Sequence, residues 1–205
     1  MADPAYIDPD TNVLTDGEAW VGLNTTTLGS DTATVTFKSG FDDTDTDVGG
    51  VQAWDQYMDL VIVSYARGAV AVVTAQLDMQ LNADTGSNYA KQRIEGSGSA
   101  AYAASWGSAT SHMLGVLPCA NATANIFMSS VTTLFDINSG KYKSGLSQAA
   151  TDLDGSTSGR VQLWGLTWKS QTPITQIKLY DATGAGDLAA GSSFSLFGVL
   201  PRMVA

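Results

Sequence analysis

The chain has 205 residues, of which 44% are hydrophobic, so it is long enough for one large domain or two small ones that need no covalent staple. Its 20 acidic and 10 basic residues give a net charge of −10, which repels phosphate and argues against nucleic acid and anionic membranes as partners. Cys119 is the only cysteine, which excludes an intrachain disulfide and a cysteine-rich metal site.

The chain begins with a Pro- and Asp-rich stretch, residues 1 to about 18, which has little periodicity and which we interpret as an extended arm. Its first residues, MADPAYIDPDTN, contain neither the basic region nor the apolar region of a secretory signal peptide. We therefore expect the protein to fold in a cytoplasm. The most apolar run, residues 60–73, is too short and too often interrupted to span a bilayer.

Strand patterns dominate the rest of the sequence. Residues 32–38, TATVTFK, alternate apolar side chains with Thr, which is typical of a half-buried strand. Residues 69–81 fit a strand or a helix, and their β-branched content favours a strand. Residues 95–111 are rich in small side chains and ambiguous, and residues 144–159 indicate a polar loop. The other predicted strands are 58–66, 89–94, 125–135, 160–168, 174–180 and 193–199.

These elements predict an all-β fold. Turn signals separate about eight to ten strands at intervals of roughly 8–12 residues, which is the pattern of a sandwich or a barrel. Eighteen of the 20 acidic residues are Asp, which favours turns over helices, and no pattern indicates a helix longer than two turns. We divide the chain into residues 1–54, an N-terminal arm with leading strands, and residues 55–205, a β-sandwich.

An acidic loop at residues 39–50, SGFDDTDTDVGG, is the main candidate for a metal site. It contains Asp42, Asp43, Asp45 and Asp47, whose oxygens suit calcium or magnesium. The spacing of an EF-hand loop is absent, and a solvated acidic loop is the favoured interpretation. We predict no metal and no cofactor, with a cation at these four residues as the alternative.

Catalytic residues are not indicated by any motif. His112 and Cys119 are the only residues of their kinds, and a Cys–His nucleophile pair would require them to meet in space with an acidic partner. A carbohydrate-active enzyme would need two carboxylates roughly 5–9.5 Å apart across a cleft, and no spacing singles out such a pair. We therefore predict a protein that is not an enzyme and has no catalytic residue.

Aromatic residues are a further candidate for function. Five Trp and seven Tyr could form a platform on which sugars stack, but core packing and subunit contacts explain them more simply. We predict that Trp20, Trp54 and Phe197 lie in an interface. In the closing strand, residues 193–199, Phe194 and Leu196 share one face and Phe197 occupies the other. We expect this strand to be buried on both sides, with one face in the sandwich core and the other against a partner or the N-terminal arm.

Three segments of the chain resemble, in the same order, a group of tailed-bacteriophage virion proteins. They are LNADTGSNYA at residues 81–90, LFDINSGKYKSG at 134–145, and the terminal segment at 165–199. The sequence departs from the group's pattern at Phe197, where Tyr is usual, and at Leu188, where Phe is usual. The terminal pattern matches at Trp168, Ile174, Ile177, Gly191, Ser192, Leu196 and Gly198.

The resemblance covers about residues 55–199 and implies a jelly-roll sandwich of phage structural proteins. It leads us to expect a capsid decoration or cement protein, a homotrimer bound to the major capsid protein on the outside of the virion and made in the cytoplasm of a bacterial host. The acidic surface would suit an outer face, away from DNA. The alternative is a tail-associated or receptor-binding module of the same fold that recognises a glycan on the host surface.

Overall fold

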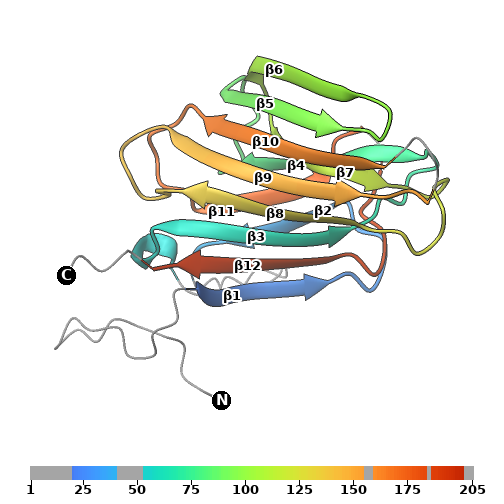
Figure 1. Cartoon of the computed structure of the whole chain (residues 1–205). Helices are drawn as coiled ribbons and strands as arrows, with labels where there is room; N and C mark the ends of the chain where they lie inside the picture. Colours follow the sequence, from blue (N-terminus) through green and yellow to red (C-terminus); the bar gives the residue numbers. More distant parts are fainter. Residues whose placement is uncertain (1–19, 41–52, 155–158, 184–185, 201–205) are drawn as a thin grey trace.

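The computed structural model describes residues 20–40, 53–154, 159–183 and 186–200 (Figure 1). It is 58% strand and 2% helix, which confirms the predicted all-β fold. The elements are β1 (Trp20–Thr27), β2 (Thr34–Lys38), the short 3-10 helix η1 (Trp54–Gln56), β3 (Asp59–Ala66), β4 (Thr74–Leu81), β5 (Tyr89–Gly96), β6 (Ala101–Ala109), β7 (His112–Pro118), β8 (Met128–Phe135), β9 (Lys143–Thr151), β10 (Arg160–Trp168), β11 (Gln176–Asp181) and β12 (Ser193–Val199).

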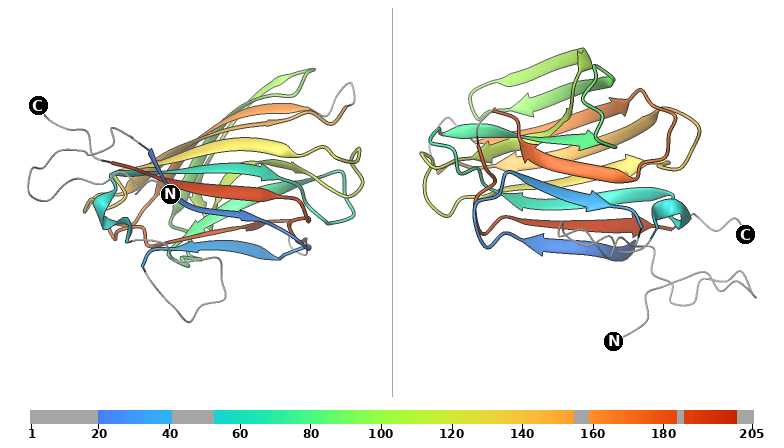
Figure 2. Two further views of the ribbon diagram at one scale, coloured as in Figure 1. Left: turned by 90° about the horizontal axis from the view of Figure 1, so that it is seen from below. Right: turned by 180° about the vertical axis from the view of Figure 1, so that it is seen from behind.

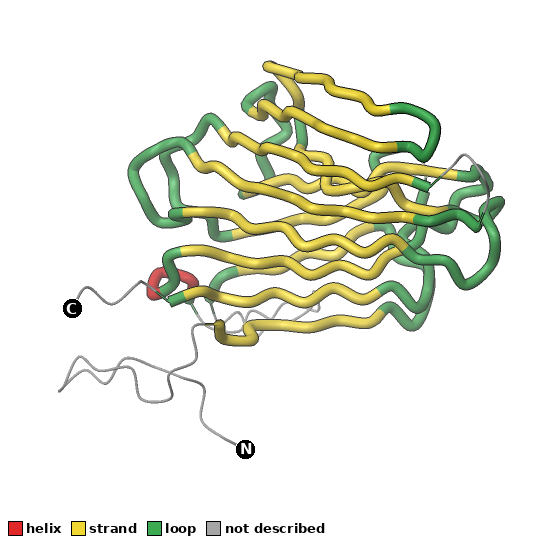
Figure 3. Tube along the Cα trace, in the orientation of Figure 1, coloured by secondary structure: helices red, strands yellow, loops and turns green. Residues whose placement is uncertain are grey.

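The strands form two antiparallel sheets packed as a sandwich, as Figure 2 shows from below and from behind. The large sheet has the order β1-β12-β3-β8-β9-β10-β5-β6, and the small sheet has the order β2-β11-β4-β7. The small sheet has half as many strands, so β5 and β6 extend the large sheet past it to a free edge. Loops join the strands at the two ends of the sandwich (Figure 3).

The pairing has the nested pattern of a jelly roll, in which one long hairpin is folded over into two sheets. β1 pairs with β12, β2 with β11, β3 with β8, and β4 with β7. Two additional hairpins, β5–β6 and β9–β10, interrupt this eight-strand core and add four strands to one edge of the large sheet. The predicted jelly-roll-like sandwich is therefore the observed fold.

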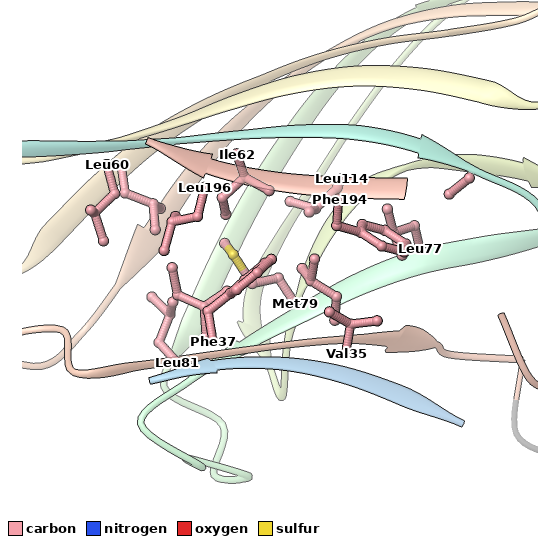
Figure 4. Close-up of a cluster of buried hydrophobic side chains, with 14 of the residues drawn as sticks. Val35, Phe37, Leu60, Ile62, Leu77, Met79, Leu81, Leu114, Phe194 and Leu196 are labelled. Carbon is pink, nitrogen blue, oxygen red and sulfur yellow. The ribbon is translucent and has the colours of Figure 1, made fainter. Parts of the chain in front are cut away.

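The core lies between the sheets and is built by strand alternation. Figure 4 shows Phe37 and Met79 of the small sheet pointing toward Ile62 and Leu196 of the large sheet. All four side chains are at most 1% exposed. Burying side chains of this size stabilises the fold by roughly 1.5–3 kcal/mol each, so the core accounts for most of the favourable free energy of folding.

The N-terminal strands belong to the same sandwich as the rest of the chain. β1 is the edge strand of the large sheet and β2 is the edge strand of the small sheet, each paired with a strand from the C-terminal part. The division drawn between residues 54 and 55 therefore does not separate two structural units. The predicted arm, residues 1 to about 18, lies outside the described residues, as do Asp42, Asp43, Asp45 and Asp47.

Two sequence predictions are corrected by the strand boundaries. The strand predicted over residues 69–81 begins only at Thr74. The backbone of residues 70–73 instead accepts hydrogen bonds from the loop that follows β7, such as Cys119 N to Val73 O at 3.0 Å. The polar loop predicted over residues 144–159 is wrong for its first half, because β9 runs to Thr151.

The polarity of β9 has a structural reason. Ser147 and Thr151 point into the sandwich, where their hydroxyls donate to the backbone carbonyls of Leu114 at 2.9 Å and Val116 at 2.6 Å. These carbonyls belong to β7, which is the other edge strand of the small sheet, opposite β2. The polar side chains of β9 therefore satisfy backbone carbonyls at a sheet edge that no other described strand pairs with. A hydrophobicity pattern does not reveal that such polar residues point inward from a strand.

Within the described part of the chain, no helix is long and apolar enough to cross a membrane.

Candidate interaction surface

The outward face of the large sheet carries almost no charge. Alternation along the strands directs Lys91, Arg93, Glu95 and Arg160 to the inward side of this sheet, together with Lys143. The remaining charged residue of the eight strands is Asp59 at the start of β3, which faces outward but is only 9% exposed.

The same outward face exposes large apolar side chains. Val161 is 68% exposed, Ile94 64%, Val131 43% and Leu163 40%. These residues lie on neighbouring strands and line a hollow of about 930 Å³, which extends to Val63 and Tyr65 of β3. A contiguous apolar patch of this kind is a candidate interaction surface. We call the outward side of the large sheet the outer face.

The predicted interface residues fall into two environments. Trp20 and Phe197 lie together on the outer face, with ring centroids 6.0 Å apart. Trp20 is 50% exposed and Phe197 is half-buried. Trp54 is only 1% exposed and packs inside the chain, so it leaves no side-chain surface for a partner. A role for Trp20 and Phe197 in an interface stays a prediction.

Within the described residues, the closing strand β12 is fully buried on one side only, and the cover expected on its other side, from a partner or the N-terminal arm, stays a prediction. It lies between β1 and β3, and Phe194 and Leu196 point into the core. Ser195 and Phe197, on the other side, are half-buried. Large apolar side chains on both sides of this strand therefore reflect a core on one side and the outer face on the other.

Apolar residues on both faces of a strand were the sequence signal for the outer face, but the strand patterns alone did not show which face would be exposed. β10 has apolar residues at both alternations, with Trp164 and Leu166 inward and Val161 and Leu163 outward. β5 likewise points Ile94 outward. Two-sided apolarity in a strand that has solvent on one side is the pattern that marks such a face.

The segments that carry the phage resemblance meet at one end of the sandwich. Asp84 accepts hydrogen bonds from Gly86 N at 2.8 Å, from the side-chain amide of Asn88 at 3.0 Å and from Trp168 Nε1 at 2.8 Å. Burial opposes its ionisation, but these three donors outweigh burial and lower the pKa of Asp84. The turn at residues 82–88 is thus tied to the end of β10, and the Asp84 carboxylate is already satisfied without a metal.

The backbone of this turn has positive φ at Asn82 (51°) and Ala83 (55°), with Asp84 N donating to Leu81 O at 2.9 Å. That combination is typical of a type I′ turn. Gly86 has a separate role, because a Cβ there would lie 2.9 Å from the Asn88 side-chain nitrogen and disrupt the contact with Asp84.

Other residues of the resemblance have equally local structural roles. Asn82 Oδ1 accepts from the backbone nitrogens of Thr175 at 2.8 Å and Gln176 at 3.0 Å, which fixes the start of β11. Ile174 lies before that strand, not in it as predicted, and is fully buried. The ring of Tyr57 packs directly on Gly198, where any Cβ would overlap it.

The two unique residues His112 and Cys119 do not form a nucleophile pair. They lie at opposite ends of β7, roughly 20 Å apart at the rise of an extended strand. Burial, together with the nearby Asp181, raises the pKa of the Cys119 thiol to about 11, so the thiol remains protonated at neutral pH. His112 packs edge-on against Tyr89 with ring centroids 4.8 Å apart. Both residues therefore act as core side chains.

His112 predicts a loss of stability in mild acid. Burial, with a smaller effect of the Lys91 charge, lowers its pKa to about 3 from an ordinary value of 6.5. The unfolded chain therefore takes up this proton below pH 6.5 while the folded chain does not, so stability falls as the pH drops from 6.5 toward 3. By pH 5 the loss from this residue is about 2 kcal/mol.

Urea unfolding of the wild type and of His112→Gln at pH 7 and pH 5 measures this loss. The carboxylates contribute the same pH dependence to both proteins, so the variant should lose about 2 kcal/mol less between the two pH values than the wild type. Equal losses in the two proteins would show that His112 is accessible to protons in the folded state.

Metal binding has no candidate in the described ranges, where no three His, Cys, Asp or Glu side chains come close enough to share an ion.

No family model matches the chain, and no curated protein or solved structure matches it.

Proposed function

We propose that this chain is a non-enzymatic structural protein of a tailed-bacteriophage particle, and more narrowly a decoration or cement protein on the outside of the capsid. In this proposal the outer face of the large sheet rests on the major capsid protein. The protein adds buried area across neighbouring shell subunits and so resists the outward pressure of packaged DNA. A homotrimer, as the resemblance implies, would place three such faces on the shell.

The uncharged outer face is the observation that carries the proposal. Eight strands about 4.8 Å apart and about eight residues long give a plane of on the order of 900 Å². A stable interface buries roughly 800 Å² on each partner, so this face is large enough for one. Its exposed Val, Ile and Leu side chains supply the apolar centre that such interfaces have.

The charge distribution supports the same orientation. A chain with a net charge of −10 is repelled by other acidic surfaces and by DNA, but a face free of exposed charge can approach a partner without burying an unpaired carboxylate. The residues of the phage resemblance, among them Asp84, Asn82 and Gly198, maintain turns and packing, as expected of a scaffold without a catalytic centre.

Binding to shells tests the proposal. Val131→Lys places a charge at the centre of the outer face. Val73→Lys is the control, because it makes the same substitution on the segment that leads into the small sheet. The two side chains have similar exposure, 43% for Val131 and 48% for Val73. We expect Val131→Lys to weaken co-sedimentation with shells of the parent phage at least tenfold, because the charge would be buried without a partner. Val73→Lys should bind as the wild type does.

Wild-type protein that fails to bind shells, or two variants that bind equally, would contradict a capsid role for the outer face. Electron microscopy of the particle with a labelled antibody against this chain provides an independent answer. Label on the head supports the proposal, and label confined to the tail supports the tail-associated alternative.

A further inference from the structure

The β5–β6 hairpin extends the large sheet past the small one (Figure 1). A groove of different chemistry lies on the inward side of this hairpin. Its volume is about 370 Å³, within the range of ligand pockets. Aromatic, cationic and hydroxyl-bearing side chains line it, in contrast to the apolar outer face. We call it the hairpin groove.

Two tryptophans form one wall of the hairpin groove. Trp106 of β6 and Trp164 of β10 stack with ring centroids 5.8 Å apart, and the Arg93 guanidinium lies 5.7 Å and 5.4 Å from their respective centres. Trp106 is 40% exposed, so it presents ring surface to solvent. Trp164 is 1% exposed, and its buried Nε1 donates no hydrogen bond.

Among the described residues, two cations and no carboxylate line the hairpin groove. Lys91 and Arg93 line it, whereas Asp78 and Glu95 do not. Arg93 NH1 lies 2.9 Å from Glu95 Oε2, and Lys91 Nζ lies 3.8 Å from Asp78, a distance too long for a direct hydrogen bond. The charged groups that a ligand in the groove would meet are therefore positive.

We propose that the hairpin groove binds a carbohydrate that carries a carboxylate, such as a uronic or sialic acid residue of a surface polysaccharide. The apolar face of the sugar ring would stack on Trp106, and its carboxylate would meet Lys91 and Arg93. The sugar hydroxyls would bond to Ser108 and Thr110. A simple inorganic anion would leave the tryptophan surface unused, and a neutral sugar would leave Lys91 and Arg93 without a ligand carboxylate.

Three charged probes test the site: sialyllactose, trigalacturonic acid and a hyaluronan tetrasaccharide, each paired with its methyl ester, which removes only the negative charge. Calorimetry and tryptophan fluorescence should detect at least one of the three with a Kd below about 5 mM, a weak affinity of about −3 kcal/mol. Its ester should bind at least tenfold more weakly, because charge-assisted hydrogen bonds to the cations are lost. No binding of any of the three acids, or equal binding of acid and ester, would overturn the proposal.

Variants locate the site. Trp106→Ala should weaken at least tenfold the binding of the acid that binds the wild type. Tyr102→Ala is the matched control, because it removes an aromatic ring of similar exposure, 47%, from the same side of β6 but outside the groove. This control variant should bind as the wild type does. Lys91→Gln should remove most of the difference between acid and ester. Binding that is unchanged in Trp106→Ala, with circular dichroism showing the wild-type fold, would place the sugar elsewhere and overturn the assignment.

This inference does not depend on the capsid proposal. The hairpin groove and the outer face lie on opposite sides of β5 and β10, so Val131→Lys should retain full sugar binding while it loses shells. If no sugar binds, the proposal that the outer face binds shells is unaffected. If no shell binds, the proposal that the hairpin groove binds a sugar is likewise unaffected.

Discussion

Phe194→Ala is expected to lower the free energy of unfolding by about 3–5 kcal/mol. The side chain is fully buried on β12 and packs between the two sheets (Figure 4), so truncation leaves a cavity that its neighbours on both sheets cannot close without moving strands. Leu196→Ala, at 1% exposure on the same side of the strand, should cost about 2–5 kcal/mol for the same reason.

Phe197→Ala is the matched control, because it removes the same side chain from the opposite side of the same strand. Phe197 is half-buried against Trp20, so the stability cost should be only about 1–2 kcal/mol. If the outer face forms a subunit contact at this edge, the same variant should weaken association more than either core variant does. Urea unfolding and the oligomer mass by light scattering measure the two effects. Equal destabilisation by all three variants with an unchanged oligomer mass would refute the assignment of an interface to Phe197.

Glu95→Ala should be the most destabilising change of a charged residue in the described structure, at about 2–4 kcal/mol. Glu95 is 1% exposed, and its carboxylate accepts from Gln162 Nε2 at 2.5 Å as well as pairing with Arg93 and Arg160. Removing it leaves two guanidinium groups close together and without their shared counter-ion. The cost is lower than for a fully buried pair, because the Arg93 and Arg160 side chains are 22% and 34% exposed and can be partly solvated.

Asp55→Ala serves as the comparison, since it removes an exposed carboxylate and should change stability by less than about 0.5 kcal/mol. The free energy of unfolding in urea at pH 7 is the measurement for both variants. Should Glu95→Ala prove as mild as Asp55→Ala, the Glu95 cluster would be a solvated pair with little influence on the fold. Arg160→Met in the Glu95→Ala background is expected to recover part of the loss, because it removes one of the two cations left facing each other.

Local patterning in the sequence determined the strand content and several boundaries. The strands predicted at residues 160–168 and 193–199 are β10 and β12 as observed, because each alternates large side chains over its whole length. The alternation of Phe194, Leu196 and Phe197 likewise predicted which side chains share a face, since that follows from the twofold period of a strand. The burial of one side and the partial exposure of the other did not follow from the alternation.

Tertiary pairing decided the strands that the patterns missed. β9 has small and polar residues at its inward positions, and these are stable there only because Ser147 and Thr151 bond to the edge of β7. β7 is buried at all seven residues, so it shows no alternation at all. Neither strand has a local signal, because the groups that satisfy its polar atoms or cover its surface come from distant parts of the chain.

Both candidate sites are products of the same long-range order. Val131, Leu163 and Ile94 come from three strands far apart in sequence, and only the order of the large sheet gathers them into one uncharged face. The hairpin groove exists because β5 and β6 pair with β10 and extend beyond the four-stranded sheet, which brings Trp106 against Trp164. The sequence by itself determined which residues alternate along each strand. Which strands become neighbours, and therefore which surfaces exist, depends on the pairing energy of the whole sandwich, which no local window of sequence contains.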